Sequence, residues 1–342
     1  MSTWIIQSCF VRAEIQSLGA MLGPAWFSIG NAEIQPFAIA PWSEDSGSEY
    51  EALPGIVQRL RGEWICVPYG IQRGDLDALP LEWQPRGTTA VELDASPHGL
   101  SSNSHWQLSE LSDDQIELVL EYPSSHPVKS VRRSIRASQA RPELEMKLRI
   151  EARAPCDLPI GLHPTFRLPT VPRRASLQLG PRARAWTSPI PLEPQIARFQ
   201  SDIRDVPLDR IPLGGSTEDI TRLPLPYAAE ETVLTRGHSG RAILTNLDER
   251  YAVTLSWDPD IFPACQLWLS NRGREIYPWN GRFLALGIEP ICAAFDLGTA
   301  VSQNKSNPLW RAGSPCTVSL SQAQPFETTY SIAVGAVTSG NY

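Results

Sequence analysis

Hydrophobic and polar residues alternate in several segments of this chain. The clearest case is LEMKLRIEAR at 144–153, where apolar side chains fall on every second position and charged ones lie between them. A period of two places the apolar side chains on one face of an extended strand. The same alternation occurs in four further segments, 115–122, 251–258, 316–322 and 328–334. These segments predict strands of a sheet that has one face in the core.

Helical periodicity is weak by comparison. Only SEYEALPGIVQRLRG, at 48–62, suggests a helix, and it contains Pro54 and Gly55. Proline removes a helical hydrogen bond and clashes with the preceding turn, so we expect this segment to be interrupted or cut to short turns. The chain is therefore predicted to be mostly β.

Prolines mark the connections between the predicted strands. They make up 31 of the 342 residues, well above the usual level of about 5%, and they gather in 168–195 and 205–227. Predicted strands lie on both sides of these stretches, and no Gly/Ser-rich linker separates them. We therefore expect a single domain over 1–342, folded as one large antiparallel β-sandwich with few short helices.

Composition narrows the class of protein. A hydrophobic fraction of 42% supports a sizeable core, and a net charge of −7 without a basic stripe argues against nucleic acid or anionic membranes as partners. No apolar run approaches the roughly 18 residues that would span a bilayer, so we expect a soluble, cytoplasmic protein, either a monomer or a homodimer. The six cysteines form no C-x-x-C pair, which disfavours a zinc site and predicts buried free thiols.

Four short segments combine a titratable or hydrogen-bonding residue with Gly, Pro or aromatic neighbours. They are LRGEWICVPYG (60–70), SPHGL (96–100), GLHPTFRLP (161–169) and LGIEPICAAFD (286–296). The last places Glu289 inside an almost wholly apolar run. An unpaired buried charge costs several kcal/mol, so this carboxylate either points to solvent from a loop or is retained for chemistry.

Together, and in this order, the four segments resemble the pattern of the aldose 1-epimerase family, the sugar mutarotases, and in particular the branch that includes hexose-6-phosphate mutarotases. That pattern runs from Arg-Gly with a following Pro-aromatic-Gly, through His-Gly and His-Pro-x-Phe, to Glu-Pro near the C-terminus. The resemblance implies a galactose mutarotase-like antiparallel sandwich that binds a sugar in a cleft. It also implies an isomerase that needs no metal or other cofactor.

The resemblance also implies roles for five residues. Interconverting the anomers of an aldose takes a base for the anomeric hydroxyl and an acid for the ring oxygen. By resemblance Glu289 is the base and His163 the acid, since reference pKa values of about 4.3 and 6.5 leave the carboxylate charged and the imidazole able to donate. An apolar wall around Glu289 is expected to raise its pKa and strengthen it as a base. His98 is expected to bind the sugar near its ring oxygen, and Arg61 to bind hydroxyls or to orient the acid. Asp219 is expected to contact a further hydroxyl.

One departure and two alternative functions stay open. The phosphate branch continues His-Gly with an aromatic residue and an arginine, whereas this chain reads HGLSS, so the sequence does not decide whether the sugar is phosphorylated. Trp268 and Trp279 are candidates to line the cleft, although tryptophans in a sandwich core are common. The alternatives are a non-catalytic carbohydrate-binding protein and an enzyme that cleaves a sugar derivative on the same fold.

Overall fold

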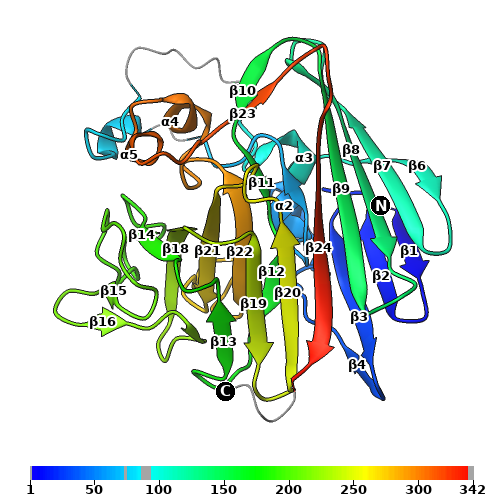
Figure 1. Ribbon diagram of the computed structural model, residues 1–342, viewed down its shortest axis with the longest axis horizontal. Coiled ribbons are helices and arrows are strands. Elements are labelled where there is room, and N and C mark those ends of the chain that lie inside the picture. The colour runs from blue at the N-terminus through cyan, green and yellow to red at the C-terminus, as the bar shows by residue number, and fades with distance from the viewer. Residues whose placement is uncertain (1, 73–74, 86–93, 338–342) are drawn as a thin grey trace.

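The computed structural model describes residues 2–72, 75–85 and 94–337 (Figure 1). Among these residues the largest sheet has nine antiparallel strands. From one edge to the other they are β17 (Arg222–Leu223), β13 (Ala175–Gln178), β19 (Arg241–Asn246), β20 (Tyr251–Trp257), β24 (Phe326–Ala336), β9 (Glu143–Ala152), β8 (Val128–Ala137), β7 (Gln115–Glu121) and β6 (Gln107–Leu111).

A second large antiparallel sheet lies behind the first in Figure 1. In the described part of the chain it has seven strands, β14 (Arg184–Thr187), β18 (Ala229–Arg236), β21 (Ala264–Asn271), β22 (Leu284–Cys292), β11 (Ile160–Leu162), β5 (Ile65–Cys66) and β12 (Thr165–Arg167). The first six follow one another in this order, while β12 pairs with β22 beside β11. Two separate strands, β11 and β12, thus share one neighbour.

Smaller elements complete the fold. The N-terminal sheet contains β1 (Thr3–Gln7), β2 (Val11–Gln16), β3 (Leu22–Ile29) and β4 (Ala32–Ile34). Two-stranded pairs are formed by β10 (Cys156–Leu158) with β23 (Val318–Leu320), and by β15 (Ile211–Pro212) with β16 (Thr217–Glu218). The helices are short: α1 (Ser48–Glu51), α2 (Gly55–Gln58), η1 (Leu76–Ala78), α3 (Gly99–Asn103), α4 (Thr299–Gln303) and α5 (Pro308–Arg311).

The alternating segments form strands, as predicted. In β9 the side chains of Leu144, Met146, Leu148 and Ile150 are buried, and Lys147 on the opposite face pairs with Glu327 of β24 at 2.9 Å. The buried faces of both large sheets and of the N-terminal sheet contribute to one apolar cluster. The mostly β, antiparallel fold class expected from the sequence is therefore confirmed.

Two predicted elements are shorter than their sequence segments. Of the segment 316–322 only β23 is a strand, and it pairs with β10 instead of joining a large sheet. The helical segment 48–62 is divided at Pro54 into α1 and α2, as the proline predicted. None of the helices in the described residues is long and apolar enough to cross a membrane.

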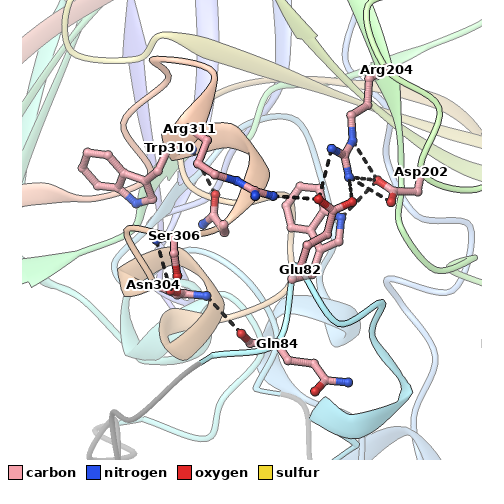
Figure 2. Close-up of polar contacts among 10 residues, drawn as sticks. Glu82, Gln84, Asp202, Arg204, Asn304, Ser306, Trp310 and Arg311 are labelled. Carbon is pink, nitrogen blue, oxygen red and sulfur yellow. Dashed lines mark hydrogen bonds and ion pairs between the residues drawn. The ribbon is translucent and has the colours of Figure 1, made fainter.

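The face of the seven-stranded sheet that points away from the sandwich is covered by loops and by α4 and α5. A second apolar cluster lies between this face and its cover. Figure 2 shows an ion-pair cluster that links the covering segments. Glu82 contacts both Arg204 and Arg311, and Arg204 also bonds Asp202. The covering loops are thereby joined to one another over the sheet.

Candidate active site

Glu289 lies on β22, and strand alternation decides which way it points. Leu286 and Ile288 belong to the sandwich core, whereas Ala285 and Ile291 belong to the second cluster on the opposite face. Because successive side chains of a strand point to opposite faces, Glu289 faces the covered side with Ile291. Its exposed fraction is 1%. The carboxylate is therefore buried in the protein and is not a solvated loop residue.

His163 lies in the short break between two strands, at the position opposite Glu289. It lies between β11 and β12, which pair with β22 on either side of Glu289, and its backbone N–H bonds the carbonyl of Trp64 at 2.9 Å. The Nε2 atom of His163 is 3.4 Å from Oε1 of Glu289. The indole of Trp64 stacks on the imidazole with ring centroids 4.1 Å apart. The acid and base implied by the resemblance are thus in contact.

His98 completes this group from the N-terminus of α3. It has a left-handed backbone, with φ at 57°, and exchanges contacts with Gly70: its N–H donates to the Gly70 carbonyl at 2.8 Å, and its Nδ1 accepts from the Gly70 N–H at 3.4 Å. Its ring meets that of His163 edge-on, with centroids 5.2 Å apart. The structure therefore brings Glu289, His163 and His98 together.

Two residues that the sequence analysis did not single out hold the carboxylate. The Tyr69 hydroxyl donates to Oε2 of Glu289, and Gln266 Nε2 lies 3.4 Å from the same oxygen and 2.9 Å from the Tyr69 hydroxyl. Gln266 is the residue opposite Glu289 on β21. Oε1 of Glu289 and Oε1 of Gln266 are buried and accept no hydrogen bond from the described residues. A buried unsatisfied polar atom costs about 1–3 kcal/mol, so a polar ligand is favoured here.

Burial sets the protonation of the group. It raises the pKa of Glu289 to about 8, against the opposing hydrogen bonds from Tyr69 and Gln266. Burial also lowers the pKa of His163 well below its ordinary value and that of His98 to about 4. Burial therefore favours the neutral form of both groups, so the proton of the pair is favoured on Glu289 and the imidazole of His163 is uncharged. The raised pKa of Glu289 agrees with the effect expected of apolar surroundings, and the charged form given by its reference pKa is not the favoured one, because desolvation outweighs the hydrogen bonds.

These side chains line a cavity of about 120 Å³. One part of its wall is apolar and is formed by Ile56, Val57, Leu60, Trp64, Trp268 and Trp279. The polar lining comes from His98, His163, Thr232, Gln266, Arg274, Glu289 and Asp296. The volume is well below the roughly 300–1,000 Å³ of pockets for drug-sized ligands, which favours a small molecule.

Arg61 and Asp219 do not reach this cavity. Leu60 lines it, and because the chain is extended at the Ile39–Arg61 bridge, Arg61 points away. Its Nε bonds the Arg59 carbonyl at 3.1 Å. Asp219 lies between β16 and β17, at the edge of the nine-stranded sheet, where Oδ1 accepts from Thr221 N at 2.8 Å. Asp219 therefore lies in a local turn outside the site, and its expected contact with the sugar is not supported.

Strand β18 carries another buried acidic side chain, which contacts two residues of the cavity lining, Trp268 and Arg274. Its residue Glu230 is fully buried and accepts a hydrogen bond from Trp268 Nε1 at 2.6 Å. Arg274, whose Nη1 is 3.4 Å from Glu230, lies over the ring of Trp279 at 4.5 Å. Gln266 is a polar residue within an apolar run, as Glu289 is, and this pattern could have identified it as a site residue. Nothing in the sequence marked Arg274.

Known structures share this architecture. A candidate aldose 1-epimerase from Escherichia coli K12 matches with a TM-score of 0.65 and 16% identity, over 98% of this chain and 99% of that chain. This is the galactose mutarotase-like fold. A galactose mutarotase related enzyme from Lactobacillus acidophilus (TM-score 0.62, 14% identity, 99% of both chains) has the same mutarotase-like fold. An aldose epimerase homologue from C. elegans also has this fold, with a TM-score of 0.59 and 13% identity over 98% of this chain and 100% of that chain.

Sequence comparison adds no further relative. No family model and no curated protein matches the chain. The mutarotase-like fold therefore rests on the structural matches, and the chemistry of the site has to be argued from its own residues.

Proposed function

We propose that this protein interconverts the α and β anomers of a monosaccharide, with Glu289 as general base and His163 as general acid. The observation that carries the proposal is the 3.4 Å separation between Glu289 Oε1 and His163 Nε2 inside a small, partly apolar cavity. The anomeric hydroxyl and the ring oxygen are bonded to the same carbon of the sugar. A neighbouring acid and base can therefore reach both at once.

The proton shared by the pair is used as follows. A sugar hydroxyl that donates to Glu289 Oε1 stabilises the carboxylate, so the shared proton moves to His163. Glu289 then takes the anomeric proton while His163 protonates the ring oxygen, and the bond between the anomeric carbon and the ring oxygen breaks. Rotation of the open aldehyde and the reverse transfers give the other anomer. We assign sugar binding next to His163 to His98, whose ring meets that of His163 edge-on.

The apolar walls support the same assignment. The indole of Trp64, stacked on His163, restricts the imidazole to one orientation, and Trp268 meets the same ring edge-on with centroids 5.9 Å apart. Aromatic faces also suit the C–H surfaces of a sugar ring. The cavity thereby excludes water from the acid and base and offers contact area to the substrate.

The test is anomer exchange measured by polarimetry or magnetisation-transfer NMR with several monosaccharides. The protein should accelerate exchange of at least one of them, and Glu289→Gln and His163→Asn should each lower the acceleration by about 100-fold or more. Glu327→Gln and His105→Asn, which alter exposed residues elsewhere, are matched controls and should leave it unchanged.

Other outcomes would lead to other conclusions. Equal rates in both site variants and the unmodified protein would remove Glu289 and His163 from the reaction. Saturable sugar binding in calorimetry without any acceleration would instead establish the alternative of a non-catalytic carbohydrate-binding protein.

A further inference from the structure

Tyr69 makes a hydrogen bond to Glu289 that the proposed reaction does not use. Its hydroxyl donates to Oε2 of the carboxylate and accepts a hydrogen bond from Gln266 Nε2 at 2.9 Å. The side chain is buried, with an exposed fraction of 1%. The other carboxylate oxygen, Oε1, faces His163. The two oxygens of Glu289 thus have different surroundings.

The fold is built to accommodate the Tyr69 ring at this place. Gly161 on β11 lies against it, and a Cβ at position 161 would collide with the ring. The Tyr69 N–H bonds the Pro159 carbonyl at 2.8 Å, and the ring of His98 meets the phenol edge-on with centroids 4.8 Å apart. The position of the hydroxyl is therefore fixed by packing on the ring and by the backbone.

We propose that Tyr69 is a positioning residue that holds Glu289 by Oε2, stabilises its charged form and leaves Oε1 free to react. Only the effect of Tyr69 on reaction rate depends on the proposed function; its effect on the Glu289 carboxylate does not. Hydrogen bonds to a charged group are stronger than those to a neutral one, so the Tyr69 donor favours the carboxylate over the carboxylic acid.

The other titratable groups around Glu289 act in the opposite direction or are held neutral. They come from every neighbouring element: His163 between β11 and β12, His98 before α3, Asp296 after β22, Cys66 on β5 and Cys265 on β21. The charge of Asp296 raises the pKa of Glu289, and burial keeps both thiols and both imidazoles uncharged. Among the described residues, the hydrogen bonds that favour the carboxylate come from Tyr69 and Gln266.

The consequence is a shift in where the shared proton resides. In the reactive form the proton is on His163 and Glu289 is charged. Removing the Tyr69 hydroxyl destabilises that form, so a smaller fraction of the protein is ready to react. It also makes the pair release its proton at a higher pH, since the pKa of Glu289 rises. A loss of packing alone would lower the rate without moving the pH profile.

The test compares Tyr69→Phe with Tyr122→Phe. Tyr122 is a buried tyrosine whose hydroxyl bonds the Val67 carbonyl at 2.6 Å, so it serves as the matched control. In Tyr69→Phe, kcat/KM near neutral pH should fall about tenfold and the alkaline limb of its pH profile should move up by about one pH unit. Tyr122→Phe should leave the position of that limb unchanged.

A second variant and a second readout keep the inference testable apart from the enzyme activity. A fluorotyrosine at position 69 keeps the ring and is a stronger donor, so it should move the alkaline limb down. Infrared titration of the carboxylic acid band that Glu289→Gln lacks should show the same two shifts, even in a protein with no activity on any sugar. An unmoved band and limb in both Tyr69 variants would overturn the inference, whereas absent acceleration with a moved band would overturn only the proposed function.

Discussion

Burial of Glu289 has a cost in stability and a use in the proposed reaction. Burial raises its pKa to about 8 in the folded protein, whereas the ordinary value is 4.5. A raised folded-state pKa means that the group contributes stability below pH 4.5, where it is protonated in both states, and that this contribution is lost as the pH rises toward 8. The carboxylate is thus costly to keep under alkaline conditions.

Glu289→Gln should therefore stabilise the protein at alkaline pH while removing its proposed activity. The amide oxygen can accept from Tyr69 and Gln266, and the amide nitrogen then faces His163. At about 1.4 kcal/mol for each pH unit between the two pKa values, the variant should gain several kcal/mol at pH 9 relative to pH 5. Urea unfolding of both proteins at the two pH values measures this. A difference that does not change with pH would contradict a buried, titrating Glu289.

At the scale of elements, the site depends on how closely β21, β22 and β11 approach one another. Gly287 lies two residues before Glu289 on the same face of β22. A Cβ at position 287 would collide with Glu289 Oε1 and lie 3.1 Å from Trp268 Cβ. The absence of a side chain at 287 makes room for Oε1 of Glu289.

Gly287→Ala should displace the carboxylate and lower anomer exchange by about 100-fold, as a misplaced catalytic group does. Overpacking should also cost about 1–3 kcal/mol of stability in urea unfolding. Gly335→Ala is the matched control, since Gly335 lies on β24 and a Cβ there meets nothing within 4 Å. Equal activity in the two variants would show that the oxygen does not need this space.

At the scale of the whole molecule, a buried ion pair links the site to the nine-stranded sheet. Arg133 of β8 and Glu63 are both fully buried and paired, and Tyr330 of β24 donates to Glu63 Oε1 at 2.7 Å. Arg133 Nη1 also bonds the Ala20 carbonyl at 2.6 Å, next to the N-terminal sheet. Glu63 precedes Trp64, which stacks on His163. The pair thus connects β8 to the segment that leads into β5, next to the residue that stacks on His163.

Arg133→Met should destabilise the protein by about 3–5 kcal/mol, because it leaves the Glu63 carboxylate buried without its cation. The double variant Glu63→Leu with Arg133→Met should recover much of that loss, since it removes both charges. Urea unfolding midpoints of the single and double variants provide the measurement. If the double variant is no more stable than the single one, the pair is not an isolated electrostatic unit.

The strands and part of the site could be predicted from the sequence because they depend on residues that are neighbours along the chain. The two-residue period of segments such as 144–153 follows from strand geometry alone, and the division of 48–62 follows from the ring of Pro54. The single domain over 1–342 stays a prediction. The motifs around His98, His163 and Glu289 were visible because Gly and Pro restrict the backbone next to them.

The sequence by itself determined which face of each strand is apolar and which polar residues interrupt apolar runs, because these properties depend on neighbours along the chain. Tertiary structure alone decided that Tyr69 and Gln266 hold Glu289, and that Arg61 and Asp219 lie outside the cavity. It also decided that burial raises the pKa of Glu289 and lowers that of His163. These outcomes depend on burial and on contacts between residues as much as 220 positions apart, which no local pattern encodes.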